Sequence, residues 1–131
     1  MEHNYDEVFE TENPLWQDLL KIFNDNEKYP KKRVKFRELH HKFPRSFSKK
    51  LGEEVDNSDE NLISLTPGQH FIVHWIYWKL ARTGYKASMA YAFNLMYKKS
   101  MSKVTYETAL EMAKDIDQIK RDMSEYKLIV E

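Results

Sequence analysis

The chain contains no cysteine. Disulfide frameworks, thiolate zinc ligands and nucleophilic thiols are therefore excluded, and any metal ion has to be bound through nitrogen or oxygen atoms. No apolar run reaches the roughly 20 residues that span a bilayer, and the acidic start MEHNYDEVFE has neither the basic nor the apolar region of a signal peptide. We therefore expect a soluble, cytoplasmic protein without a membrane partner.

The chain also lacks an excess of charge of either sign, because 21 basic and 21 acidic side chains balance each other. The two signs are nevertheless separated along the sequence: residues 1–30 have a net charge of −6 and residues 31–50 a net charge of +8. Residues 51–75 contain five acids and no bases, whereas residues 76–103 contain six bases and no acids. The two basic blocks could form one surface that faces phosphates, or they could be ordinary solvated charges.

The length of 131 residues suits a single domain, 1–131. Asn13-Pro14 is typical of a helix start and predicts a helix over 14–25. Alternation of apolar and basic residues predicts a short strand over 33–41, followed by a polar connection over 42–60. Loops of that length are usually functional or disordered. The short apolar run at 61–65 predicts a second strand.

The strongest local signal is Thr66-Pro67-Gly68-Gln69, a capping box with proline at the first helical position. We expect a helix to begin at Pro67 and to end near Gly84; its body, residues 70–81, is apolar nearly all round and should be buried. Two more helices are expected at about 86–99 and 105–125. The fold class is therefore α+β and mostly helical, with a two-stranded antiparallel hairpin, a central buried helix and additional N- and C-terminal helices.

Four of the five histidines form an ordered set around these elements. His40 and His41 end the first predicted strand, while His70 and His74 lie four residues apart, which places both on one face of the predicted helix. The pair in the helix alone also fits a hydrogen-bonded feature of the core. The order of strand, His-His, long loop, Asn61, strand and capped helix favours a metal site.

Two segments, ELHHKFPRS (38–46) and NLISLTPGQHFIVH (61–74), resemble the two halves of the HNH, or ββα-metal, nuclease motif. They are most similar to the HNH proteins of phages and to the nuclease domains of DNase colicins. The stretch 87–111 is more loosely similar to the helical tail of phage HNH endonucleases. The resemblance implies a ββα-metal catalytic core over 33–81 and a C-terminal helical extension over 85–125.

The resemblance also assigns roles to single residues. His40, His70 and His74 would bind one divalent metal ion, and His41 would be the general base. Asn61 would steady the loop that bears the base, and Glu38 matches a supporting acidic residue of the colicin-like pattern. Neutral imidazole, with a pKa near 6.5, can take a proton from water at neutral pH, while a metal stabilises charge on the scissile phosphate. In a regular strand His40 and His41 face opposite ways, so the backbone has to twist there for both to serve one site.

The implied activity is hydrolysis of DNA phosphodiester bonds, with Lys31, Lys32, Arg33, Arg37, Lys42 and Arg45 as candidate DNA-binding residues. The ion could be Zn, Ni, Mn or Mg, and three imidazoles favour a borderline transition metal. Two alternatives remain: a catalytically silent HNH-fold module that binds DNA or protein as a phage regulatory factor, and a structural protein whose histidines bind zinc. The latter needs a closed four-ligand site. Sequence specificity could come from DNA shape, a homodimer or a partner.

Overall fold

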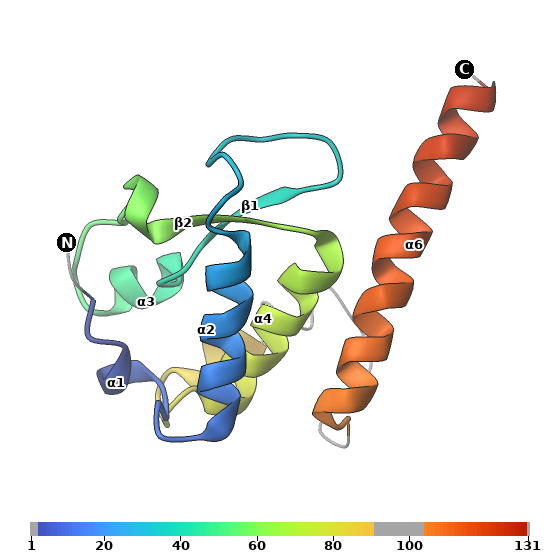
Figure 1. The fold of residues 1–131 in the computed structure, drawn as a ribbon. Coiled ribbons are helices and arrows are strands. Elements are labelled where there is room, and N and C mark those ends of the chain that lie inside the picture. Colours follow the sequence, from blue (N-terminus) through green and yellow to red (C-terminus); the bar gives the residue numbers. More distant parts are fainter. Residues whose placement is uncertain (1–2, 91–103, 131) are drawn as a thin grey trace.

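The structure, a computed structural model, describes residues 3–90 and 104–130. It is α+β and mostly helical with one two-stranded antiparallel sheet, as the sequence predicts (Figure 1). The elements in chain order are α1 (Tyr5–Val8), α2 (Pro14–Asn26), β1 (Glu38–His41), α3 (Arg45–Lys50), the 3-10 turn η1 (Asp59–Asn61), β2 (Leu62–Leu65), α4 (Pro67–Leu80) and α6 (Tyr106–Val130).

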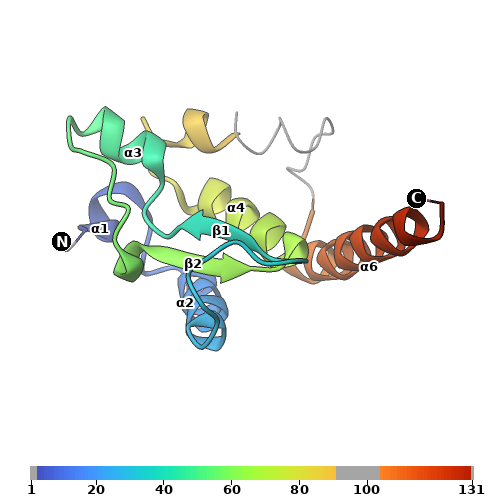
Figure 2. The same ribbon diagram turned by 90° about the horizontal axis from the view of Figure 1, so that it is seen from above.

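The sheet joins β1 to β2 over four residue pairs, from Glu38 opposite Leu65 to His41 opposite Leu62. Seen from above, the two strands lie between α4 and α2 (Figure 2). His40 is buried and its ring lies against rings of α4, which places the site between β1 and α4.

Helix α4 begins where the capping box predicts. The Thr66 hydroxyl accepts a hydrogen bond from the Gln69 N–H, and the Gln69 side chain accepts one from the Thr66 N–H. The predicted end near Gly84 is wrong. The helix ends at Leu80, because Ala81 is extended and its backbone pairs with Phe9 of the N-terminal segment.

Helix α4 is the centre of the hydrophobic core, as its apolar sequence predicts. It packs against α2 on one side and α6 on another, and α6 extends past the rest of the fold (Figures 1 and 2). The largest fully buried side chains include Tyr77, Phe9, Phe43, Phe47 and Phe71. This packing fixes the α4 backbone that carries two of the four site histidines.

Two details around the strands differ from the prediction. The strand expected over 33–41 begins only at Glu38, because Phe36 has a left-handed backbone with φ 65° and the chain turns between Val34 and Arg37. The loop expected over 42–60 contains the helix α3, and Asn61 closes the turn η1 instead of starting β2.

The helices at the two ends of the chain were predicted less completely. Helix α1 was not predicted, and the helix expected over 105–125 runs to Val130. Residues 86–90 of the helix expected over 86–99 are helical, and the remainder of that prediction lies outside the described residues. Within the described chain, no helix is both long and apolar enough to cross a membrane.

Candidate metal centre

Three imidazole rings converge between β1 and α4. His40 comes from the middle of β1, and His70 and His74 come from successive turns of α4. The Nε2 atoms of His70 and His74 lie 2.9 Å apart, and one nitrogen from each of the three rings lies within 4.8 Å of the others. The three histidines are therefore close enough to bind one metal ion.

Burial keeps two of these rings, those of His40 and His74, neutral. Burial lowers the pKa of His40 well below its ordinary value, and the neighbouring histidines lower it further. Burial, followed by the nearby His70, lowers the pKa of His74 to about 3. Because neutral imidazole is the form that coordinates a metal, the cluster is prepared for binding at neutral pH.

The hydrogen bonding of the rings also fits a metal ion. The Nε2 atom of His40 is buried and has no hydrogen-bond partner, and an unsatisfied buried polar atom costs about 1–3 kcal/mol. A coordinated ion would satisfy it. Nitrogens that share a tetrahedral zinc at about 2.0–2.1 Å are about 3.3 Å apart, so the cluster needs only small side-chain adjustments.

Glu38 lies beside the cluster on the same face of β1 as His40. Its Oε1 atom is 3.6 Å from Nδ1 of His70, and the neighbouring His70 lowers the pKa of the Glu38 carboxyl. A carboxylate behind a metal-binding imidazole orients the ring and increases its basicity. Glu38 is thus placed to support His70, in agreement with its expected role as a supporting acid.

His41 remains in β1, and its ring makes a different contact from that of His40. Its Nε2 atom is 2.8 Å from Oδ1 of Asn57, an interaction in which the ring N–H donates and leaves Nδ1 as the basic nitrogen. His40, His41 and His74 nevertheless line one pocket of about 240 Å³. Both neighbouring histidines therefore line one pocket, although the strand is unbroken between them.

Asn57 was not singled out in the sequence. Its only signal there is the turn-prone run Asp56-Asn57-Ser58-Asp59, which predicts a turn but not a contact with a histidine 16 residues earlier. The contact depends on how the segment between α3 and β2 folds back over the end of β1.

Asn61 is buried and joins the two segments that frame His41. Its Oδ1 accepts a hydrogen bond from the Phe43 N–H at 2.9 Å, and its Nδ2 donates to the Asp56 carbonyl at 2.8 Å. Its own carbonyl accepts from the Lys42 N–H. Asn61 therefore holds the loop after His41, where the resemblance to the HNH motif places it, and it makes no hydrogen bond to the imidazole.

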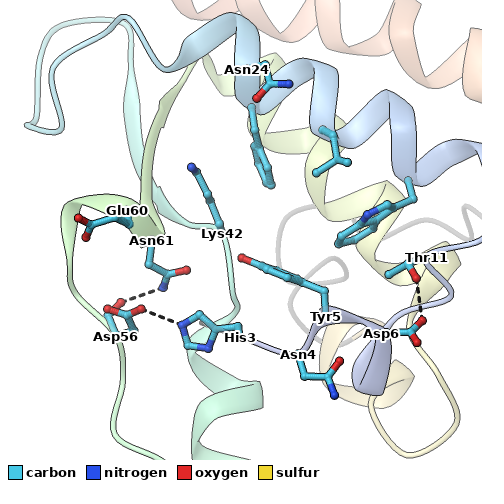
Figure 3. Close-up of a pocket in the computed structure, with 13 residues that line it drawn as sticks. His3, Asn4, Tyr5, Asp6, Thr11, Asn24, Lys42, Asp56, Glu60 and Asn61 are labelled. Carbon is cyan, nitrogen blue, oxygen red and sulfur yellow. Dashed lines mark hydrogen bonds and ion pairs between the residues drawn. The ribbon is translucent and has the colours of Figure 1, made fainter. Parts of the chain in front are cut away.

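A larger pocket of about 660 Å³ is lined by Asn61, Lys42 and the N-terminal segment, and none of the three clustered histidines lines it (Figure 3). The Nε2–H of His3 donates to the Asp56 carboxylate at 2.7 Å, and the His3 ring stacks on Phe43 at 4.3 Å between ring centroids. These contacts attach the N-terminal segment to the loop at Asp56, with which Asn61 also forms a hydrogen bond.

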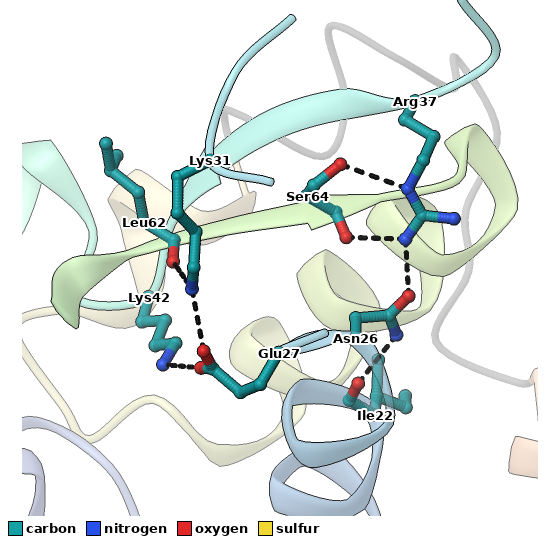
Figure 4. Close-up of polar contacts among 8 residues, drawn as sticks. All are labelled: Ile22, Asn26, Glu27, Lys31, Arg37, Lys42, Leu62 and Ser64. Carbon is teal, nitrogen blue, oxygen red and sulfur yellow. Dashed lines mark hydrogen bonds and ion pairs between the residues drawn. The ribbon is translucent and has the colours of Figure 1, made fainter. Parts of the chain in front are cut away.

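Three of the six candidate DNA-binding residues have internal partners. Lys31 and Lys42 both pair with Glu27, the C-cap residue of α2, and Lys31 also donates to the Leu62 carbonyl (Figure 4). Arg37 donates to the Ser64 carbonyl at 2.7 Å and to the Asn26 side chain, and its guanidinium lies 3.5 Å from the Tyr29 ring centre. These side chains connect the sheet to α2, on the side away from His40.

The other three candidates are exposed. Arg45 begins α3 and lines the same pocket as His41 and His74, so it alone of the six is beside the histidines. Lys32 and Arg33 are exposed in the segment before β1. Lys49, in the last turn of α3, adds an exposed cation to the helix that begins at Arg45.

No protein-family model matches the chain, and neither the curated proteins nor the solved structures contain a match to it. The functional argument therefore depends on the residues and their geometry.

Proposed function

We propose that the protein is a metal-dependent DNA endonuclease of the HNH type. The observation that carries the proposal is the convergence of His40, His70 and His74 beside a pocket that His41 also lines. Three protein ligands leave coordination positions open for phosphate and water, as a catalytic site requires, whereas a structural zinc site is normally closed by four. Within the described residues, the cluster contains these three histidines.

Each residue then has a distinct task. His41 takes a proton from the attacking water at Nδ1, because its Nε2–H is directed to Asn57. Asn61 holds the loop that follows His41, and Glu38 orients His70. A bound divalent ion supplies Lewis-acid stabilisation of the charge that develops on the scissile phosphate and its leaving oxygen. Three imidazoles favour Zn or Ni over Mn and Mg.

The exposed cations of α3 support DNA as the substrate. Arg45 lies at the mouth of the His41 pocket, and Lys49 extends the positive surface along the same short helix. Phosphate contacts of this kind position a duplex without reading its sequence. Lys31, Arg37 and Lys42 already have partners within the protein. We therefore propose that the exposed cations of α3, and not these three residues, bind the phosphates of the scissile strand.

The proposal is tested by incubating the purified protein with supercoiled plasmid across Zn, Ni, Mn and Mg, with a chelator control. We expect conversion to nicked or linear plasmid that depends on the ion and stops in chelator. A variant with His40, His70 and His74 all changed to Gln should be inactive with every ion. Cleavage that persists in this variant at the wild-type rate would refute the proposed centre.

A further inference from the structure

A second pocket lies at the opposite end of β1 from His41. It has a volume of about 310 Å³ and is formed by the turn before β1, the start of α4 and one face of α6. Lys35, Arg37 and Glu38 line it from the turn and the strand, and Lys120 and Ser124 line it from α6. We call it the α6 pocket.

The charges of the α6 pocket suit an anion. The Arg37 guanidinium already donates hydrogen bonds to Ser64 and Asn26, and the Glu38 carboxylate lies 3.6 Å from Nδ1 of His70. Lys35 and Lys120 are exposed, and neither forms an ion pair within residues 3–90 and 104–130. Two ammonium groups and the Ser124 hydroxyl provide the donors that bind a phosphate group.

The turn that carries Lys35 has an unusual backbone. Phe36 adopts φ 65°, which costs energy for an aromatic residue and is found preferentially where a ligand or a mechanism requires it. The guanidinium of Arg121, also from α6, lies 5.0 Å from the Phe36 ring centre. The turn is therefore held against α6, which keeps Lys35 and Lys120 at one pocket.

The α6 pocket and the pocket that His41 lines lie at opposite ends of β1. Glu38 lines the α6 pocket and contacts His70, whereas His41 and Arg45 line the pocket at the other end of the strand. A four-residue strand is about 13 Å long at about 3.3 Å per residue. This length corresponds to about four base-pair rises of about 3.4 Å.

We propose that the α6 pocket binds a backbone phosphate of the DNA substrate, a few nucleotides from the phosphate at the metal centre. The identity of the duplex as ligand rests on the proposed function, whereas the affinity of the pocket for phosphate rests on its own side chains. With Arg45 at one end of β1 and Lys35 and Lys120 at the other, the strand backbone of the DNA is held on both sides of the histidine cluster.

The test is a salt titration of binding to a labelled duplex in chelator. The double variant Lys35→Gln, Lys120→Gln is compared with wild type and with Lys114→Gln, which removes an exposed lysine from the same helix outside the pocket. Loss of one phosphate contact should reduce the salt slope by about 0.9 and weaken binding at low salt by about tenfold. Lys114→Gln should leave both unchanged, and equal melting midpoints should show that all three proteins fold.

A second arm separates the two sources of phosphate. Inorganic phosphate is titrated into the wild type and the double variant, and the amide signals of Lys120 and Ser124 are followed by NMR. Shifts with inorganic phosphate, combined with an unchanged duplex slope in the double variant, would overturn the DNA assignment and leave a site for free phosphate. If the double variant keeps the wild-type salt slope and inorganic phosphate shifts no amide signal of the wild type, the α6 pocket is not a phosphate site of either kind.

The outcomes for this pocket and for the nuclease activity are distinguishable. If wild type cleaves plasmid and the double variant keeps the wild-type salt slope, the pocket proposal fails and the proposed function stands. If the slope falls but no ion supports cleavage by wild type, the pocket stands and the nuclease proposal fails.

Discussion

At the scale of single residues, His41 is the proposed general base, whereas His40, His70 and His74 are the proposed metal ligands. His40, His70 and His74 converge on one point, whereas the His41 ring is held by Asn57 at the edge of the same pocket. A base and a ligand can be distinguished experimentally, because a base outside the coordination shell contributes to rate and a ligand contributes to metal affinity.

A change at Glu38 tests whether its carboxyl supports the proposed metal ligands. Glu38→Gln removes the charge that faces Nδ1 of His70 but keeps the size of the side chain. Loss of such a partner usually weakens metal affinity or activity by about 10–100-fold. We expect a loss of this size in metal affinity by calorimetry, with Glu107→Gln, an exposed carboxyl at the start of α6, as the control. Equal affinities for the two variants would remove Glu38 from the site.

The lowered pKa values of His40 and His74 predict an acid-sensitive metal-free protein. The unfolded chain takes up protons on these rings near pH 6.5, whereas folded His74 does so only near pH 3. Stability should therefore decrease as the pH falls from about 6.5 towards 3, by about 1.4 kcal/mol per pH unit for each such histidine. The measurement is urea unfolding in chelator at several pH values.

His74→Gln provides the comparison for this pH dependence. Glutamine does not titrate, so the proton uptake linked to unfolding should fall by about one between pH 6 and pH 4. A variant whose stability has the same pH dependence as the wild type would show that His74 is not a buried neutral ring.

At the scale of elements, the placement of α4 depends on its contact with α6. The Asp117 carboxylate accepts hydrogen bonds from the Gly68 N–H at 2.7 Å and from the Thr66 hydroxyl at 2.9 Å. A negative charge at a helix N-terminus is favourable. A side chain at Gly68 has no room, because its Cβ would lie 2.2 Å from the Ala113 carbonyl oxygen.

We therefore predict that Asp117→Ala lowers the free energy of unfolding by about 1–2 kcal/mol, the range for loss of a capping side chain. Asp115→Ala, an exposed acid on the same helix, should change it by less than about 0.5 kcal/mol. Thermal or urea unfolding measures both. A loss for Asp115→Ala as large as for Asp117→Ala would contradict the capping role.

The elements differ in how far the sequence could predict them. Helix α4 was predictable because the Thr66 capping box and the apolar body are local signals. The late start of β1 was not, because the turn at Phe36 is held by contacts of Arg37 with Ser64 and Asn26, which are 27 and 11 residues away. Helix α3 was missed because its six residues carry no strong helix signal.

The residues of the site also differ in how far the sequence could predict their contacts. The order of elements was enough to predict that the His40-His41 pair lies near His70 and His74, whereas the choice of His40 as the third member of the cluster came from the resemblance to the HNH motif. The pairing of Lys42 with Glu27 could not be predicted, because the two residues are 15 positions apart. The same holds for the hydrogen bond from Lys31 to the Leu62 carbonyl, which is 31 positions away. A basic residue is free for DNA only if the fold leaves it without an acidic neighbour.

At the scale of the whole molecule, the first basic block is divided between two sides of the sheet. Lys31, Arg37 and Lys42 connect the sheet to α2, whereas Arg45 lines the pocket of His41 and His74 and Lys49 is exposed on the same short helix. The fold thus uses three of the nine basic residues of the block for structural contacts and leaves two others exposed on α3.

This division predicts different effects of charge removal on DNA binding. Arg45→Gln with Lys49→Gln should lower the magnitude of the salt slope by about 2 in duplex binding with chelator, because two phosphate contacts are lost. Lys21→Gln, which removes an exposed lysine from the acidic N-terminal part, should have no effect. Equal salt slopes for the double variant and Lys21→Gln would show that the α3 surface does not contact the DNA.

The most direct test of the central claim compares wild type and His41→Ala, each loaded with the same metal ion. Metal content and affinity are measured by calorimetry, and nicking of supercoiled plasmid is measured on the same samples. The account predicts that the variant binds one ion with near wild-type affinity and cleaves about 10²–10⁴-fold more slowly, the usual contribution of a general base. Wild-type cleavage by metal-loaded His41→Ala, or loss of its metal ion, would contradict the assignment of His41 as the base.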